Sequence, residues 1–96
     1  MNLFDFPKER LLQEQCLEVL AHKNVRIEKI ISQNHTTDWY DQAEDEWVVL
    51  LKGSAAIEYG DNMIMLNEGE SAFIPRHKEH RAVSIGDCIW LCVFIA

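Results

Sequence analysis

A chain of 96 residues has room for one domain, and a hydrophobic content of 48% is enough to form a compact core. The formal net charge of −7 argues against binding to nucleic acid or to an anionic membrane, both of which need a basic surface. The three cysteines, Cys16, Cys88 and Cys92, have no disulfide spacing. With no signal-peptide pattern and no apolar run long enough to span a bilayer, we expect a cytoplasmic protein.

The beginning of the chain predicts an arm and a helix. Two phenylalanines in residues 1–7 predict an arm that packs on the protein, and Pro7 is favourable in the first turn of a helix. Over Lys8–Ala21, leucine and cysteine recur every four positions, which predicts one amphipathic helix docked on a sheet. We therefore expect the arm and helix over about residues 1–23 and a barrel over about residues 24–96.

The remainder predicts roughly seven short strands bounded by turn signals. Because no helical segment separates them, a parallel α/β sheet is excluded and a sandwich or small barrel is expected. Several strands are apolar on both faces, and one short helix cannot cover that surface, so we expect a homodimer. The expected strands span residues 25–32, 46–52, 54–59, 63–66, 71–75, 80–85 and 88–95.

Glu46 opens an apolar strand and shares a face with Val48 and Leu50. Its carboxylate can therefore point into the interior, where it needs a hydrogen-bond partner, a cation or a metal. The alternative is a carboxylate at the strand end that reaches solvent, as Glu44 and Asp45 do before it.

Two histidines follow the strand that stops at Pro75. His80 begins the next strand, where a barrel mouth is expected, and neutral imidazole is the commonest ligand for transition metals. With Glu46 it makes half of a mixed nitrogen and oxygen site suited to Zn, Fe, Mn or Ni. Alternatively, His77 and His80 are solvated or hydrogen-bonded loop residues.

A Trp-Tyr-Asp-Gln segment precedes Glu46. Trp39 and Tyr40 can line an apolar pocket or seal the core. Asp41 and Gln42 bring two side-chain oxygens near the carboxylate, so either could complete a site there.

Gly53 follows Glu46 by seven residues, and Gly69, Pro75 and His80 follow at spacings of six and five residues. On these residues, the chain from Trp39 to Ser84 resembles the cupin superfamily of small jelly-roll barrels. His77 stands where the family's second motif has its middle glycine, and Ser84 stands where the motif has an asparagine. The resemblance implies an all-β fold, a cupin-type jelly-roll barrel with one short N-terminal helix. The matching positions are Glu46 and Gly53 of the first motif, and Gly69, Pro75 and His80 of the second. The two histidines of the first motif are replaced by Trp39 and Asp41 or by Tyr40 and Gln42.

The resemblance implies a metal-binding cupin as the first functional hypothesis. Glu46 and His80 would be ligands for Fe, Mn, Zn or Ni, joined by Asp41 or Gln42, and His77 could supply a second nitrogen if the turn brings it inward. Open positions on the metal would take water, substrate or oxygen, and the protein could act on a small organic molecule.

Two other hypotheses remain open. In a metal-free binding module, Glu46 and His80 would hydrogen-bond to each other beside an apolar pocket. In a structural protein, the apolar strands would form a dimer and the pocket would have no role. Both pocket hypotheses predict that Glu46 and His80 lie within about 5 Å of each other. The expected ligand contacts are Trp39, Tyr40, His77 and Arg81.

Overall fold

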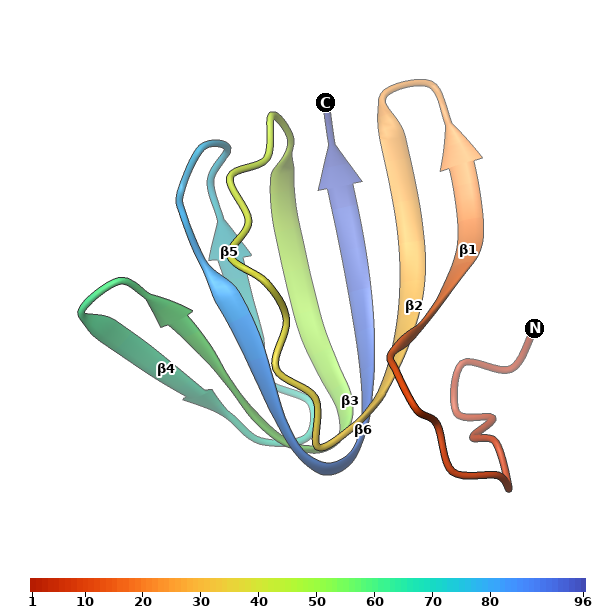
Figure 1. Ribbon diagram of the computed structural model, residues 1–96. Helices are drawn as coiled ribbons and strands as arrows, with labels where there is room; N and C mark the ends of the chain where they lie inside the picture. The colour runs from red at the N-terminus through yellow and green to blue at the C-terminus, as the bar shows by residue number, and fades with distance from the viewer.

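The structure is a computed structural model of residues 1–96, and it contains six β-strands and no α-helix (Figure 1). The strands form one antiparallel sheet in the order β1-β2-β6-β3-β4, and β5 pairs with β3. The all-β prediction is confirmed, and the structure has no helix capable of crossing a membrane. The strands are β1 (Gln15–His22), β2 (Val25–Gln33), β3 (Asp45–Tyr59), β4 (Asn62–Leu66), β5 (Ser71–Ile74) and β6 (Arg81–Ile95).

Strands β3 and β6 are each 15 residues long and run through both walls of the curled sheet (Figure 1). The sequence predicted a break at Gly53 and another at Gly86, but both glycines lie inside a continuous strand. The register between β3 and β6 shifts between Leu50 and Ser54, which marks an irregularity where the sheet bends. Gly53 has φ 93°, and it packs directly against Asp87 and Cys88 of β6.

The predicted helix over Lys8–Ala21 is wrong. Residues Gln15–His22 form β1, which pairs with β2 along its whole length, with one register shift at Val19. A spacing of four residues places side chains on one face of a strand as well as of a helix, because four is a multiple of the strand period of two. The side chains that suggested a docked helix are largely solvent-exposed, and Leu12 is 98% exposed.

The arm over residues 1–7 lies on the outer face of the sheet, where Phe6 contacts Lys52 and Phe4 stays 63% exposed. Lys29 on β2 is only 2% exposed, and its Nζ donates hydrogen bonds to the carbonyl oxygens of Asn2 and Asp5, at 3.3 and 2.5 Å. Lys52 Nζ lies 4.5 Å from the ring centroid of Phe6. Two lysines of the outer face thus hold the arm in place.

The inner face of the curled sheet holds the hydrophobic core. Strands β3 and β6 supply most of it, because alternate residues of both strands point inward. Few polar side chains are buried with it, and Glu46 and His80 are two of them, at 6% and 5% exposed. The buried apolar cluster contains Val48, Leu50, Ala55, Ile57, Leu66, Ile74, Cys88, Trp90, Cys92 and Phe94.

Candidate ligand-binding site

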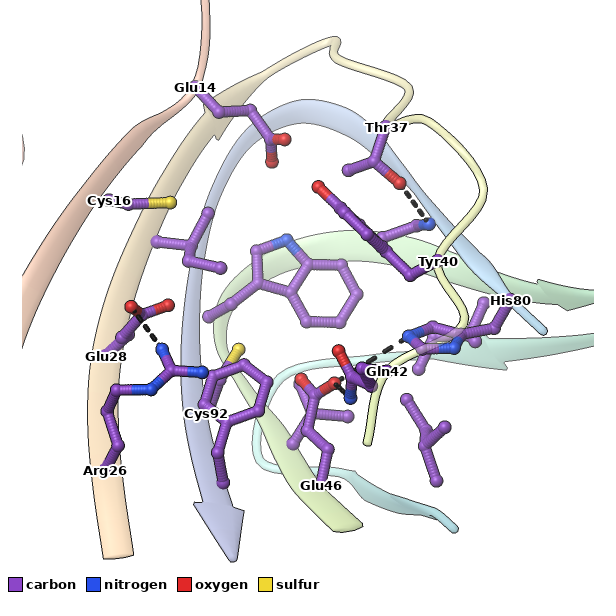
Figure 2. Close-up of a pocket in the computed structure, with 17 residues that line it drawn as sticks. Glu14, Cys16, Arg26, Glu28, Thr37, Tyr40, Gln42, Glu46, His80 and Cys92 are labelled. Carbon is purple, nitrogen blue, oxygen red and sulfur yellow. Dashed lines mark hydrogen bonds and ion pairs between the residues drawn. The ribbon is translucent and has the colours of Figure 1, made fainter. Parts of the chain in front are cut away.

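The inner face of the curled sheet encloses a cavity of about 250 Å³. Most of the residues that line it are hydrophobic, and polar side chains enter from two sides (Figure 2). One polar group contains Gln42, Glu46 and His80; the other contains Glu14, Cys16, Arg26 and Glu28. The apolar part includes Ile30, Val48, Ile57, Ile74, Trp90 and Phe94.

Strand alternation in β3 turns Glu46 into this cavity. Trp47, the next residue, points outward and is 42% exposed, whereas Val48 is again buried. Gln42 Nε2 donates a 2.8 Å hydrogen bond to Glu46 Oε1, and His80 Nε2 lies 3.7 Å from the same oxygen. The predicted approach of Glu46 and His80 to within 5 Å is therefore confirmed.

Backbone pairing fixes the position of His80. The amide of Tyr40 donates to the His80 carbonyl at 2.7 Å, and the amide of His80 donates to the Tyr40 carbonyl at 3.0 Å. His80 Nδ1 lies 2.8 Å from the Lys78 carbonyl oxygen. A carbonyl oxygen only accepts, so Nδ1 carries a hydrogen and Nε2 is the nitrogen that faces Glu46.

This arrangement favours a charged imidazolium beside a carboxylate. Burial disfavours the charged form of His80, but the Glu46 carboxylate 3.7 Å away and the hydrogen bond to the Lys78 carbonyl together outweigh burial and raise the pKa of the imidazole above its ordinary value. Burial also raises the pKa of the neighbouring Cys92 thiol well above its ordinary value, and Glu46 raises it further. The pair can therefore donate a proton or a charged hydrogen bond to a bound molecule, whereas Cys92 stays a neutral thiol.

Charged residues of the opposite wall come from β2 and from the segment before β1. Arg26 donates to Glu28 at 2.5 Å and to Glu44 at 2.8 Å, and its guanidinium lies 4.1 Å from the ring centroid of Phe94. Glu14 accepts a 2.6 Å hydrogen bond from the hydroxyl of Ser32. Arg26 is therefore already paired with two carboxylates. Glu14, in contrast, has a neutral hydroxyl as its partner.

Asp41 and His77 lie outside the cavity, although both stand beside its lining in the sequence. The two side chains contact each other, with Nδ1 2.8 Å from Oδ1, and they are 59% and 65% exposed. His77 has φ 62°, so its backbone occupies the left-handed turn that carries the side chain to the surface. Of the two oxygen donors predicted near Glu46, the structure brings in Gln42 and leaves Asp41 outside.

Trp39 and Arg81 form a second surface contact. The Arg81 guanidinium lies 4.7 Å from the ring centroid of Trp39 and donates a 2.8 Å hydrogen bond to Glu58. Neither residue lines the cavity, whereas Tyr40 does. Of the four predicted ligand contacts, Tyr40 therefore lines the cavity. The other three, Trp39, His77 and Arg81, do not.

The donor set at Glu46 does not fit a transition-metal site. One imidazole nitrogen and one carboxylate converge there, and Gln42 presents its NH₂ group to the carboxylate. Such sites use three or four protein ligands, and no group of three His, Cys, Asp or Glu side chains in the chain has the arrangement to hold a metal. Glu46 is instead satisfied by two nitrogens.

Sequence reasoning missed the wall that contains Glu14, Cys16, Arg26 and Glu28. Cys16 on β1 is the register partner of Ile30 on β2, and Glu28 and Arg26 follow Ile30 at alternate positions on the same face of β2. Glu14 lies two residues before Cys16, just ahead of β1, and also lines the cavity. The alternation of Arg26, Glu28 and Ile30 is visible in the sequence of β2. Because Lys8–Ala21 was predicted to be a helix, the sequence did not indicate that β1 extends the same face.

The sequence and the fold of this chain match known proteins. The family model described as Cupin domain matches residues 31–94. A Ralstonia eutropha JMP134 structure, proposed to be a mannose-6-phosphate isomerase, is 30% identical, with a TM-score of 0.90 over 99% of this chain and 95% of that chain.

Two other solved structures show the same fold at lower identity. A cupin superfamily protein from Desulfitobacterium hafniense DCB-2 is 20% identical, with a TM-score of 0.84 over 93% of this chain and 83% of that chain. A cupin-2 domain protein from Shewanella frigidimarina NCIMB 400 is 19% identical, with a TM-score of 0.76 over 85% of this chain and 80% of that chain. None of the curated proteins matches. The family model, which matches more than half of the chain, shows that this chain belongs to the cupin family.

Proposed function

We propose that this cupin binds a small organic molecule in the cavity without needing a metal. The observation that carries the proposal is the Glu46–His80 pair, 3.7 Å apart and almost fully buried, at the edge of a largely apolar cavity. Buried charged groups beside an apolar cavity are typical of a site that orients a ligand through a few polar contacts. The volume of about 250 Å³ favours a ligand smaller than a typical drug molecule.

The charges of the cavity disfavour a phosphorylated sugar. The R. eutropha relative raises that possibility through its proposed assignment as a mannose-6-phosphate isomerase. A phosphate group needs cationic or backbone donors, and Arg26 is the one guanidinium that lines this cavity. Arg26 is already bonded to Glu28 and Glu44, so the phosphate would have to compete with two carboxylates.

The competing hypothesis is a metal-dependent cupin, and one experiment separates the two. Protein purified without a metal-affinity tag is analysed for Fe, Mn, Zn and Ni, then treated with EDTA and screened by ligand-observed NMR against a mixture of small aromatic alcohols, amines and acids. We expect EDTA-treated protein to bind members of the mixture. Binding that appears only after a metal is restored, or no binding at all, would overturn the proposal.

Two variants locate the binding. Ala82 lines the cavity on β6, so Ala82→Phe should fill part of it and weaken binding at least about tenfold. Asn67 is exposed in the turn after β4 and does not line the cavity, so Asn67→Phe adds the same side chain elsewhere and should leave binding unchanged. Equal binding by both variants would place the bound compounds outside the cavity.

A further inference from the structure

The cavity has an uneven distribution of charge, and this points to the chemical class of its ligand. Three carboxylates line it, from Glu14, Glu28 and Glu46, against two basic side chains, Arg26 and His80. The whole chain carries a formal net charge of −7, which adds a negative field around the cavity mouth.

Two of the three carboxylates already have a basic partner within the protein, so they are less available to bind a charged group of a ligand. Glu28 bonds to Arg26 at 2.5 Å, and Glu46 faces His80 at 3.7 Å. Glu14 takes part in none of the ion pairs of the chain, and its one hydrogen-bond partner is the hydroxyl of Ser32. Glu14 is thus the carboxylate of the cavity that lacks a cation.

Glu14 is directed at the cavity. Figure 2 shows its carboxylate entering from the segment before β1, with the hydroxyl of Tyr40 turned toward it from the opposite loop. Burial raises the pKa of the Tyr40 phenol, and the negative charge of Glu14 is the next cause. The phenol therefore stays neutral and can accept a hydrogen bond from a cation bound beside Glu14.

Aromatic rings also line the cavity. Trp90, which is 3% exposed, lines the cavity together with Tyr40. Ring faces attract cations, and this attraction strengthens where water is excluded. A carboxylate without a cation, a neutral phenol and an indole together favour a positively charged group over a neutral or anionic one.

We propose that the ligand of this cavity is a small primary amine with an apolar body, whose ammonium group binds Glu14. The inference rests on the proposed binding function and specifies its ligand class. The apolar body packs on the aliphatic and aromatic lining of the cavity. A carboxylate ligand is disfavoured because it would face Glu14 without a free cation.

Three probes of similar shape test the charge preference. Benzylamine, benzyl alcohol and benzoate are titrated into the EDTA-treated full-length protein, and affinities are measured by NMR. We expect benzylamine to bind about tenfold more tightly than benzyl alcohol, and benzoate to bind most weakly. Added NaCl should weaken benzylamine binding more than benzyl alcohol binding, because salt screens the charge.

A conservative variant tests the role of Glu14. Glu14→Gln keeps an oxygen that can accept from Ser32 but removes the charge, so it should abolish the preference for benzylamine over benzyl alcohol. Glu9→Gln, at an exposed position outside the cavity, makes the same change in net charge and should preserve the preference.

Separate results would overturn the two proposals. If benzyl alcohol binds in the cavity, as shown by its loss in Ala82→Phe, but benzylamine binds no more tightly, the amine assignment is overturned and the binding function stands. An unchanged preference in Glu14→Gln also overturns the assignment. If neither these probes nor the wider mixture binds, the binding function is overturned with it.

Discussion

His80 Nε2 faces Glu46 Oε1 at 3.7 Å, while His80 Nδ1 is bonded to the carbonyl oxygen of Lys78 at 2.8 Å. Both ring nitrogens therefore lie next to oxygens that accept hydrogens. The imidazolium form, with a hydrogen on each nitrogen, fits these surroundings better than either neutral tautomer. The buried pair is consequently both a binding element and a source of pH-dependent stability.

The first prediction concerns pH. The pKa of His80 is raised in the folded protein, so its contribution to stability is fully present below its unfolded value of about 6.5 and is lost as pH rises through the folded pKa. Urea unfolding of wild type and His80→Gln between pH 5.5 and 9 should show the largest difference at the acidic end. His22→Gln, at an exposed position on β1, is the control for removing a histidine. A difference that is constant or grows with pH would contradict the charged pair.

The spacing around Glu46 and His80 made this part of the site predictable. Glu46 belongs to an alternating strand, so its inward direction follows from the burial of Val48 and Leu50. The cupin-like spacing to His80 then placed the two residues together. His77 was less predictable, because its outward direction depends on a left-handed turn that the residue type does not indicate.

The opposite wall could not be predicted in the same way. Its residues reach the cavity because β1 pairs with β2, and the four-residue spacing in β1 fits a helix equally well. The two long strands were also divided in two, because glycine usually ends a strand. Here Gly53 permits the bend instead, since its positive φ and missing side chain let β3 continue along the second wall.

The second prediction tests this role of Gly53. A Cβ at this position would overlap the carbonyl oxygen of Asp87 and the Sγ of Cys88, and φ is 93°. Gly53→Ala should therefore lower the free energy of unfolding by more than about 2 kcal/mol. Gly60→Ala is the matched control, because Gly60 also has a positive φ, 62°, but open space around it, so a loss of about 1 kcal/mol is expected. Equal losses in urea unfolding would show that the close approach at Gly53 has no effect.

The third prediction concerns the N-terminal arm. Lys29 is buried, and its Nζ donates to the carbonyl oxygens of Asn2 and Asp5. Lys29→Met keeps much of the apolar stem but removes both hydrogen bonds, so it should release the arm and cost about 1–3 kcal/mol. Hydrogen exchange of residues 1–14 should become faster. Lys8→Met, at an exposed position, should leave this exchange unchanged, and protection of the arm in Lys29→Met would show that other contacts hold it.

The fourth prediction concerns self-association, which the apolar outer strands led us to expect. Trp47 and Phe73 are cross-strand partners on β3 and β5, and they remain 42% and 58% exposed on the outer face. Two neighbouring exposed aromatic residues favour a surface that a second copy covers. Sedimentation velocity at micromolar concentration should give a dimer for wild type and a monomer for Phe73→Glu. Leu12→Glu, at a site that is 98% exposed in the segment before β1, should remain a dimer. A monomeric wild type, or a dimeric Phe73→Glu protein, would exclude an interface at this aromatic pair.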